Sequence, residues 1–268
     1  MTDGTVNAMD IVDRAVEKGV VEERFDLKVD AEVVPGIRWS PETASGPIPT
    51  ILIGHGGTQH KRVPNVLGLA RTFVRHLGVT VVALDAPGHG DRVTDRAAAE
   101  AARARLQSRI AERKGAMELS PEEARAWTER TRAGVAEWKA LVDDLEAGGT
   151  HDGRLGYWGV SMGTAIGLPF VAAEPRVTAA VLGLAGLNAR PGAADFEAAA
   201  RSLTVPVLFL FQWDDELMSR ESGIALFDAI GSKEKTMHVN PGGHVAMPLF
   251  ERTAATEHFR RHLLDGAT

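Results

Sequence analysis

Short apolar runs separated by amphipathic stretches make up most of the chain from residue 51 onward. Each run ends in a glycine-rich or polar turn, which predicts a strand buried on both faces of a sheet. We expect these strands at 51–53, 79–84, 154–158, 178–184, 205–211 and 235–239. Apolar residues three to four positions apart predict helices at 67–77, 95–113, 121–147, 162–173, 196–202, 222–230 and 253–264. This alternation favours a mainly parallel, doubly wound sheet with helices on both faces.

The amino-terminal region follows a different pattern. Residues 7–19 predict a short amphipathic helix that ends at Gly19. Alternating apolar and polar residues at 20–34 predict one or two strands. A stretch rich in Pro, Gly and Ser at 40–49 predicts a loop. The first buried strand should follow that loop directly.

A polar section rich in Ala and Arg interrupts the alternation after the second buried strand. We interpret residues 92–134 as a helical insert in a single domain that spans residues 1–268. An apolar stripe on the second predicted helix should pack on a neighbour, and it consists of Trp127, Thr131, Val135, Trp138, Leu141 and Leu145. We expect the insert to form a partial cap over the site or an oligomer surface such as that of a homodimer. The alternative is a set of solvated helices beside the core.

Charge and composition exclude several classes of function. The formal charge is −6, and no clustered basic face points to nucleic acid or to an anionic membrane. No apolar stretch approaches the roughly 18 to 20 residues that span a membrane, and the amino terminus lacks the pattern of a signal peptide. We therefore expect a cytoplasmic protein with no membrane partner. The absence of cysteine excludes disulfides, thiolate catalysis and iron–sulfur sites.

A candidate nucleophile lies between a predicted strand and a predicted helix. Ser161 is the centre of Gly-Val-Ser-Met-Gly at 159–163. A tight strand-to-helix turn needs small residues two positions before and after the serine, and it lifts the hydroxyl clear of the sheet. The alternative is a serine that only caps the helix. The position of the motif favours a nucleophile.

A nucleophilic serine needs a general base, and four histidines follow Ser161. His244 lies in a loop directly after a predicted strand, where functional groups of a parallel sheet gather. His238 lies inside a strand and should point into packing. His258 and His262 lie four positions apart on the last helix, which predicts a solvated face. His244 is therefore the candidate base, and its alternative is a structural loop histidine.

The acid that orients the base should follow the strand at 205–211. Asp214, Asp215 and Glu216 all lie in that loop. A carboxylate must turn back to meet the imidazole, which needs a few loop residues after the strand. Asp215 fits this requirement better than Asp214, and Glu216 is the third alternative.

Further residues are expected to bind the oxyanion and the substrate. Backbone N–H groups of Met162 and Gly57 should form the oxyanion hole, with Gly56 as the second choice for the latter. Side chains expected near the substrate lie at strand ends, and they are His60, Trp213 and Met218. The basic segment at 60–62 meets either an anionic substrate or only solvent. No metal or organic cofactor is needed for this chemistry.

With these motifs in hand, the chain resembles the α/β-hydrolase superfamily, especially its dienelactone-hydrolase and prolyl-oligopeptidase-like esterase branches. The matching segments are HGG at 55–57, DAPGHG at 85–90, WGVSMG at 158–163, QWDDEL at 212–217 and PGGH at 241–244. The resemblance implies an acid four residues past its strand, which supports Asp215, and a structural role for His89. Thr164 stands where many relatives have Gly, and we expect it to affect packing only.

The residues and the resemblance together predict a serine hydrolase of the carboxylesterase type. It should cleave ester-like bonds of small or medium substrates through an acyl-enzyme. Thioesterases, lactonases, amidases and carbon–carbon-bond hydrolases use the same triad and remain alternatives. An acyltransferase is a further alternative, and a non-catalytic binding protein on the same scaffold is the least favoured.

Overall fold

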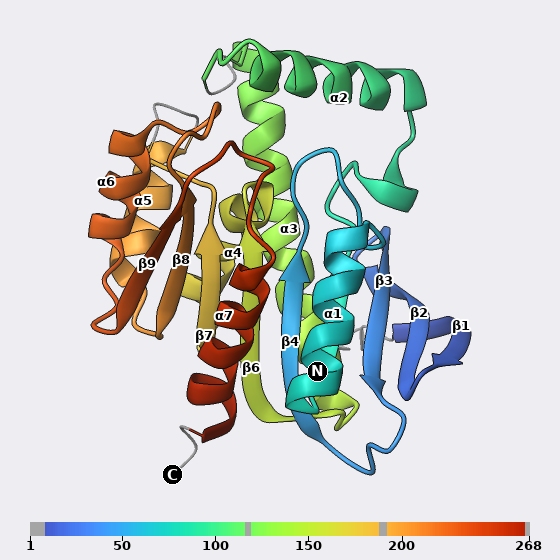
Figure 1. Cartoon of the computed structure of the whole chain (residues 1–268). Coiled ribbons are helices and arrows are strands. Elements are labelled where there is room, and N and C mark those ends of the chain that lie inside the picture. Colours follow the sequence, from blue (N-terminus) through green and yellow to red (C-terminus); the bar gives the residue numbers. More distant parts are fainter. Residues whose placement is uncertain (1–8, 116–118, 188–191, 266–268) are drawn as a thin grey trace, which may run out of the picture.

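A single mixed sheet runs through the computed structural model, which describes residues 9–115, 119–187 and 192–265. Within these residues nine strands follow the order β1-β2-β3-β5-β4-β6-β7-β8-β9 (Figure 1). Their bounds are β1 (Met9–Glu17), β2 (Val20–Val29), β3 (Glu32–Pro41), β4 (Ile48–Gly54), β5 (Thr80–Leu84), β6 (His151–Val160), β7 (Val177–Gly183), β8 (Val207–Gln212) and β9 (Lys235–Asn240). Neighbours among β4 to β9 pair in parallel, whereas β1, β2 and β3 are antiparallel to their neighbours.

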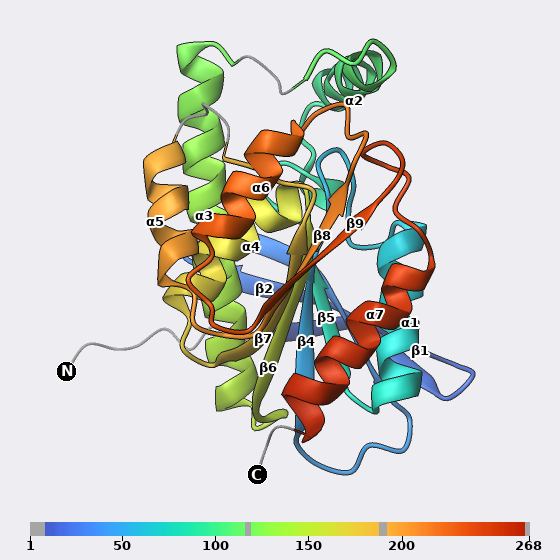
Figure 2. The same ribbon diagram turned by 60° about the vertical axis from the view of Figure 1, so that its left-hand side comes forward.

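Helices cover both faces of the sheet. Their bounds are α1 (Pro64–Leu77), α2 (Arg96–Ala111), α3 (Pro121–Ala147), α4 (Met162–Ala173), α5 (Ala193–Ser202), α6 (Arg220–Ala229) and α7 (Phe250–Phe259), which continues as a π-helical segment (Arg260–Asp265). Figure 2 shows α1 and α7 on one face and α3 to α6 on the other. This arrangement confirms the predicted doubly wound α/β fold. No helix within the described residues is long and apolar enough to cross a membrane.

Two apolar clusters, one on each side of the sheet, stabilise the fold. Successive residues of a strand contribute to opposite clusters, as Tyr157 and Trp158 of β6 do. Both faces of the central strands are therefore buried, as their continuous apolar runs predict. The predicted stripe of α3 also packs inward, because Trp138 contacts the rings of Tyr157 and Phe170. The stripe thus fixes α3 against β6 and α4.

The prediction of a helix at 7–19 is wrong for the residues that the structure describes. Met9–Glu17 forms strand β1, which pairs antiparallel with β2, while residues 7 and 8 lie outside the described part. Lys18 and Gly19 connect the two strands, with φ values of 52° and 78°. Such a two-residue turn matches the twist of a hairpin and so favours strand pairing over a helix. The β-branched residues of β1 fit a strand equally well, although they remain mostly exposed.

The helical insert, residues 92–134, lies at the end of the sheet where the parallel strands terminate. Figure 1 shows α2 running across the molecule beyond the carboxyl ends of β4 and β8. No residue of α2 is buried, so this helix is not part of either core cluster. The α3 helix begins at a capping box, in which Ser120 and Glu123 bond each other's backbone N–H. Residues 116–118 of the insert lie outside the described part.

Candidate active site

Ser161 occupies a sharp turn between β6 and α4. Its φ of 58° and ψ of −117° are strained for a residue with a side chain. A Cβ at Gly159 would lie 2.7 Å from the carbonyl oxygen of Gly163, and a Cβ at Gly163 would lie 2.4 Å from that of Gly54. Both glycines are therefore required by close backbone contact. The turn has the form that the Gly-x-Ser-x-Gly pattern predicts.

The hydroxyl of Thr164 stabilises this turn through hydrogen bonds. It accepts a hydrogen bond from the Gly183 N–H at 2.8 Å, and its own hydrogen can reach the carbonyl oxygens of Gly183 (2.7 Å) or Gly159 (2.8 Å). The N–H of Ser161 also donates to the Gly183 carbonyl, at 2.9 Å. The prediction that Thr164 affects packing only is therefore wrong. Its hydroxyl joins the turn at Ser161 to Gly183 at the end of β7.

The structure brings Ser161, Asp215 and His244 together from the ends of three different strands. Nε2 of His244 lies 2.9 Å from the Oγ of Ser161, and Nδ1 of the same ring lies 2.7 Å from Oδ2 of Asp215. The imidazole and the Asp215 carboxylate are both buried. A serine hydroxyl, a base and an orienting carboxylate in this geometry can carry out nucleophilic acyl transfer.

The three acidic residues after β8 have different partners. Oδ1 of Asp215 accepts the N–H groups of Leu217 and Met218 at 2.8 and 2.9 Å, which holds its other oxygen toward the imidazole. Asp214 is half-exposed and pairs with Arg220 at 3.1 Å. Glu216 accepts the backbone N–H of His244 at 2.7 Å. Only Asp215 among the three therefore contacts the imidazole ring.

The loop after β4 carries Gly57 to the nucleophile turn. A Cβ built on Gly57 would lie 4.0 Å from the Cβ of Met162, so the two predicted oxyanion donors belong to adjacent backbone segments. The carbonyl oxygen of Gly56 lies 2.8 Å from Nδ1 of His55. Because the two polar groups of a trans peptide point in opposite directions, the Gly57 N–H is directed away from the His55 ring.

His55 is neutral and connects two loops through hydrogen bonds. Its Nε2 accepts the N–H of Ala86 at 3.0 Å, which leaves Nδ1 to donate to Gly56. Burial lowers the pKa of His55 to about 4, in agreement with a neutral ring. His89 lies beside it, with a ring centroid separation of 5.4 Å, and bonds the Pro87 carbonyl oxygen. The contacts of His89 match the structural role that the family resemblance implies.

The basic segment at 60–62 does not form a solvated surface as a whole. Lys61 is buried, and its ammonium group lies 2.5 Å from Asp85 and 2.6 Å from Asp91. Its hydrogen bond lowers the pKa of Asp91. Arg62 is exposed and pairs with Glu22 at 2.8 Å. Lys61 is thus buried and paired with two carboxylates of this chain, so it is not available to an anionic substrate.

Of the side chains predicted near the substrate, Trp213 and His60 are exposed and Met218 is partly buried. The guanidinium of Arg220 lies 4.3 Å from the centroid of the Trp213 ring. Met218 packs against the core cluster that contains α4. Their contact with a substrate stays a prediction.

Two predictions about other histidines are wrong. His238 does not point into packing, because its side chain is partly exposed and pairs with Glu251 at 2.9 Å. His258 does not belong to a solvated face, because its Nε2 is buried, and this burial lowers the pKa of the ring to about 4. Its ring lies 4.7 Å from that of His262 and its Nε2 has no hydrogen-bond partner among the described residues. The period of a helix shows which residues share a face but not what covers that face.

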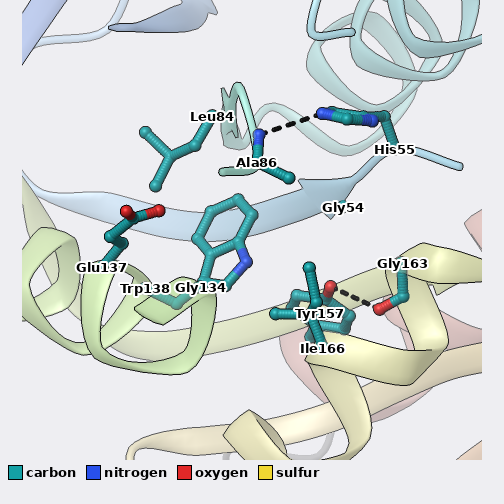
Figure 3. A pocket seen from close by; sticks show the side chains of 10 residues that line it. All are labelled: Gly54, His55, Leu84, Ala86, Gly134, Glu137, Trp138, Tyr157, Gly163 and Ile166. Carbon is teal, nitrogen blue, oxygen red and sulfur yellow. Dashed lines mark hydrogen bonds between the residues drawn. The ribbon is translucent and has the colours of Figure 1, made fainter. Parts of the chain in front are cut away.

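A small cavity lies behind the nucleophile turn, with room for about one water molecule (Figure 3). The hydroxyl of Tyr157 donates to the Gly163 carbonyl at 2.8 Å on one side of it. On another side, burial raises the pKa of Glu137, which pairs with Arg92 at 2.8 Å. The bond from Tyr157 supports the turn at Ser161 from beneath. No cluster of three or more histidine or acidic side chains among the described residues is arranged to hold a metal ion.

The fold and this site together define the α/β-hydrolase class, in which a serine on a strand-to-helix turn stands at the carboxyl edge of a mainly parallel sheet. No family model and no curated protein sequence match the chain. Among solved structures, the chain is similar to a cold-adapted esterase from an Arctic intertidal metagenomic library. The two share 36% identity over 94% of this chain and 98% of that one, with a TM-score of 0.76.

More distant structures share the fold alone. One is acetyl xylan esterase 1 from Thermoanaerobacterium sp. JW/SL YS485, with 17% identity, 98% and 89% coverage and a TM-score of 0.70. Another is a dienelactone hydrolase from Anabaena variabilis, with 16% identity, 91% and 99% coverage and a TM-score of 0.60. The chain belongs to the α/β-hydrolase superfamily and to the same family as this cold-adapted esterase. The resemblance to the superfamily that the motifs indicate is therefore confirmed.

Proposed function

We propose that this protein is a serine carboxylesterase that acts on small or medium ester substrates through Ser161, His244 and Asp215. The observation that carries the proposal is the position of the His244 ring, with one nitrogen 2.9 Å from Ser161 Oγ and the other 2.7 Å from Asp215 Oδ2. An imidazole held in this way accepts the serine proton on one side and is stabilised as a cation on the other. The similarity to a cold-adapted esterase supports the same chemistry.

The first half of the reaction forms an acyl-enzyme. Ser161 Oγ attacks the ester carbonyl carbon while its proton passes to Nε2 of His244. The carbonyl oxygen becomes negatively charged, and the N–H groups of Met162 and Gly57 stabilise it. When the tetrahedral intermediate collapses, the bond to the leaving oxygen breaks, and His244 returns the proton to the departing alcohol.

The second half releases the acid. His244 takes a proton from a water molecule, whose oxygen attacks the acyl carbon, and the same two N–H groups stabilise the second oxyanion. Collapse then breaks the bond to Ser161 Oγ, and His244 returns the proton to that oxygen. The buried carboxylate of Asp215 stabilises the imidazolium in both halves. The free enzyme is thereby restored without any cofactor taking part.

We further propose that the helical insert forms a partial cap over this site. The N–H of Gly115, just after α2, donates to the carbonyl oxygen of Glu216 at 2.9 Å. The guanidinium of Arg113 donates to the carbonyl oxygen of Asp214 at 3.2 Å. The end of α2 is therefore bonded to the loop that carries Asp215. A helix anchored at that point lies close enough to limit the size of the substrate.

A panel of p-nitrophenyl esters, thioesters and lactones tests the proposed function. We expect the purified protein to hydrolyse short-chain and medium-chain p-nitrophenyl esters, and Ser161→Ala to abolish this turnover while its circular dichroism spectrum is unchanged. Turnover of thioesters or lactones with little ester hydrolysis would replace the carboxylesterase assignment. Ester hydrolysis by Ser161→Ala at the wild-type rate would refute the proposed nucleophile.

A further inference from the structure

Glu216 contacts the proposed base through the backbone, whereas Asp215 contacts it through the ring. Oε2 of Glu216 accepts the His244 N–H at 2.7 Å. A charged acceptor makes a stronger hydrogen bond than a neutral one, especially where the pair is partly shielded from water. Adjacent residues of one loop thus hold two different parts of His244.

Gly243 makes room for this carboxylate. A Cβ on Gly243 would lie 2.1 Å from Oε1 of Glu216 and 2.6 Å from Oε2. The φ of Gly243 is not in the left-handed region, in contrast to Gly242, whose φ is 117°. The backbone at 243 could therefore accept another residue, but the Cβ of that residue would displace the Glu216 carboxylate.

The loops after β8 and β9 also contact each other through residues that precede His244 in the sequence. The N–H of Trp213 donates to Asn240 O at 2.7 Å, and the N–H of Asp214 donates to Gly242 O at 3.1 Å. The side-chain amide of Gln212 donates to Gly243 O at 3.3 Å. These bonds extend the β8–β9 pairing beyond the sheet. The bond from His244 to Glu216 continues the connection to the base itself.

We propose that Glu216 is a positioning residue for catalysis, which fixes the backbone of His244 so that Nε2 stays within reach of Ser161. It acts through His244 and does not touch the substrate. The inference rests on the proposed function, because it assumes that His244 is the general base. The bond from Gly115 to the Glu216 carbonyl also connects the helical insert to this residue.

Two substitutions of Glu216 test the inference. Glu216→Ala removes the acceptor, and we expect kcat to fall by about 10- to 100-fold with little change in KM, because a small displacement of the base slows proton transfer. Glu216→Gln keeps an oxygen that can accept the His244 N–H, and we expect it to retain most of the wild-type kcat. Glu257→Ala is the control, since this exposed glutamate lies on α7 and pairs with Arg260 at 3.5 Å.

A double-mutant cycle with Gly243 sharpens the test. In the wild-type background, Gly243→Ala should displace the Glu216 carboxylate and lower kcat much as Glu216→Ala does. In the Glu216→Ala background, the same substitution meets no carboxylate and should lower kcat little further. The two changes should therefore be strongly non-additive.

Two further quantities are measured for each variant. They are the melting temperature and the rate at which a fluorophosphonate labels Ser161. Slower labelling at an unchanged melting temperature supports the positioning role, and rescue by Glu216→Gln supports it further. A wild-type kcat and labelling rate in Glu216→Ala, or strictly additive effects in the cycle, would overturn it. Failure of the proposed function itself looks different, because the wild-type protein would then be neither active nor labelled.

Discussion

Lys61 and Asp85 form a buried ion pair that joins the loop after β4 to the loop after β5. The ammonium nitrogen lies 2.5 Å from Oδ2 of Asp85, and the backbone N–H of Lys61 donates to Oδ1 at 3.0 Å. The side chain of Asp85 is fully buried, and that of Lys61 almost so. A carboxylate in this position depends on its partner, because charges separated from water are unfavourable unless they are paired.

The first prediction concerns the stability that this pair provides. Lys61→Met leaves Asp85 buried without its main counter-charge, and we expect it to lower the free energy of unfolding by about 3–5 kcal/mol. Arg62→Ala removes the neighbouring, exposed cation and should lower it by less than about 1 kcal/mol. Urea unfolding of both variants measures the difference. Equal, small effects would show that Asp85 does not need Lys61.

The second prediction separates Asp215 from its neighbour. Asp215→Asn keeps the shape of the side chain but removes the charge that stabilises the imidazolium, and kcat should fall on the order of 10⁴-fold. Asp214→Asn changes a half-exposed carboxylate that does not contact the ring, so its effect should be far smaller. Steady-state kinetics on one p-nitrophenyl ester compares the two. A larger loss in Asp214→Asn would transfer the role of the acid to that residue.

The choice of Asp215 illustrates what the sequence can provide. In a parallel sheet the carboxyl ends of the strands share one edge, so the loops that follow Val160, Gln212 and Asn240 lie at the same edge of the sheet. The apolar runs predict where each strand ends, and the residues between a strand and the next helix give the length of the loop. The grouping of Ser161, His244 and an acid was therefore predictable, although the sequence left three acids open for the third position.

The contacts that depend on side-chain direction were not predictable in this way. Lys61 looked like part of a solvated basic segment because its partners lie 24 and 30 positions away in the chain. His258 looked solvated for the same reason, since its helix α7 contacts β7 and β8, which are distant from it in sequence. At β1 the spacing of apolar residues fitted a helix, and the hairpin turn at Lys18 decided otherwise. The sequence shows only that Glu216 is an acid next to Asp215, and its bond to the His244 N–H is seen only in the structure.

The third prediction concerns pH. Burial lowers the pKa of His258 from its ordinary value of 6.5 to about 4 in the folded protein. The unfolded chain therefore binds a proton at higher pH, so His258 makes the folded state less stable as pH falls from about 6.5 toward 4. In His258→Phe this contribution is absent, and the loss of stability between about pH 7 and pH 4 should be smaller by on the order of 1–3 kcal/mol. Chemical unfolding at several pH values compares the two proteins, and identical pH profiles would contradict the burial of His258.

The fourth prediction concerns the brace behind the nucleophile. Thr164→Val removes a buried hydroxyl that bonds the Gly183 N–H, and it should lower the free energy of unfolding by about 1–3 kcal/mol. Thr164→Ser keeps the hydroxyl and should lose much less. Thermal unfolding of the pair checks this. A valine variant as stable as the serine variant would return Thr164 to a packing role alone.

The central claim is that Ser161 is a nucleophile activated by His244, and covalent labelling tests it most directly. The protein is treated with a fluorophosphonate, and the mass of the adduct and its position are determined by mass spectrometry of the intact and digested chain. We expect one adduct, located on Ser161, that is absent in Ser161→Ala and forms far more slowly in His244→Ala. An unlabelled wild-type protein, or an adduct on another residue that persists in Ser161→Ala, would contradict the account.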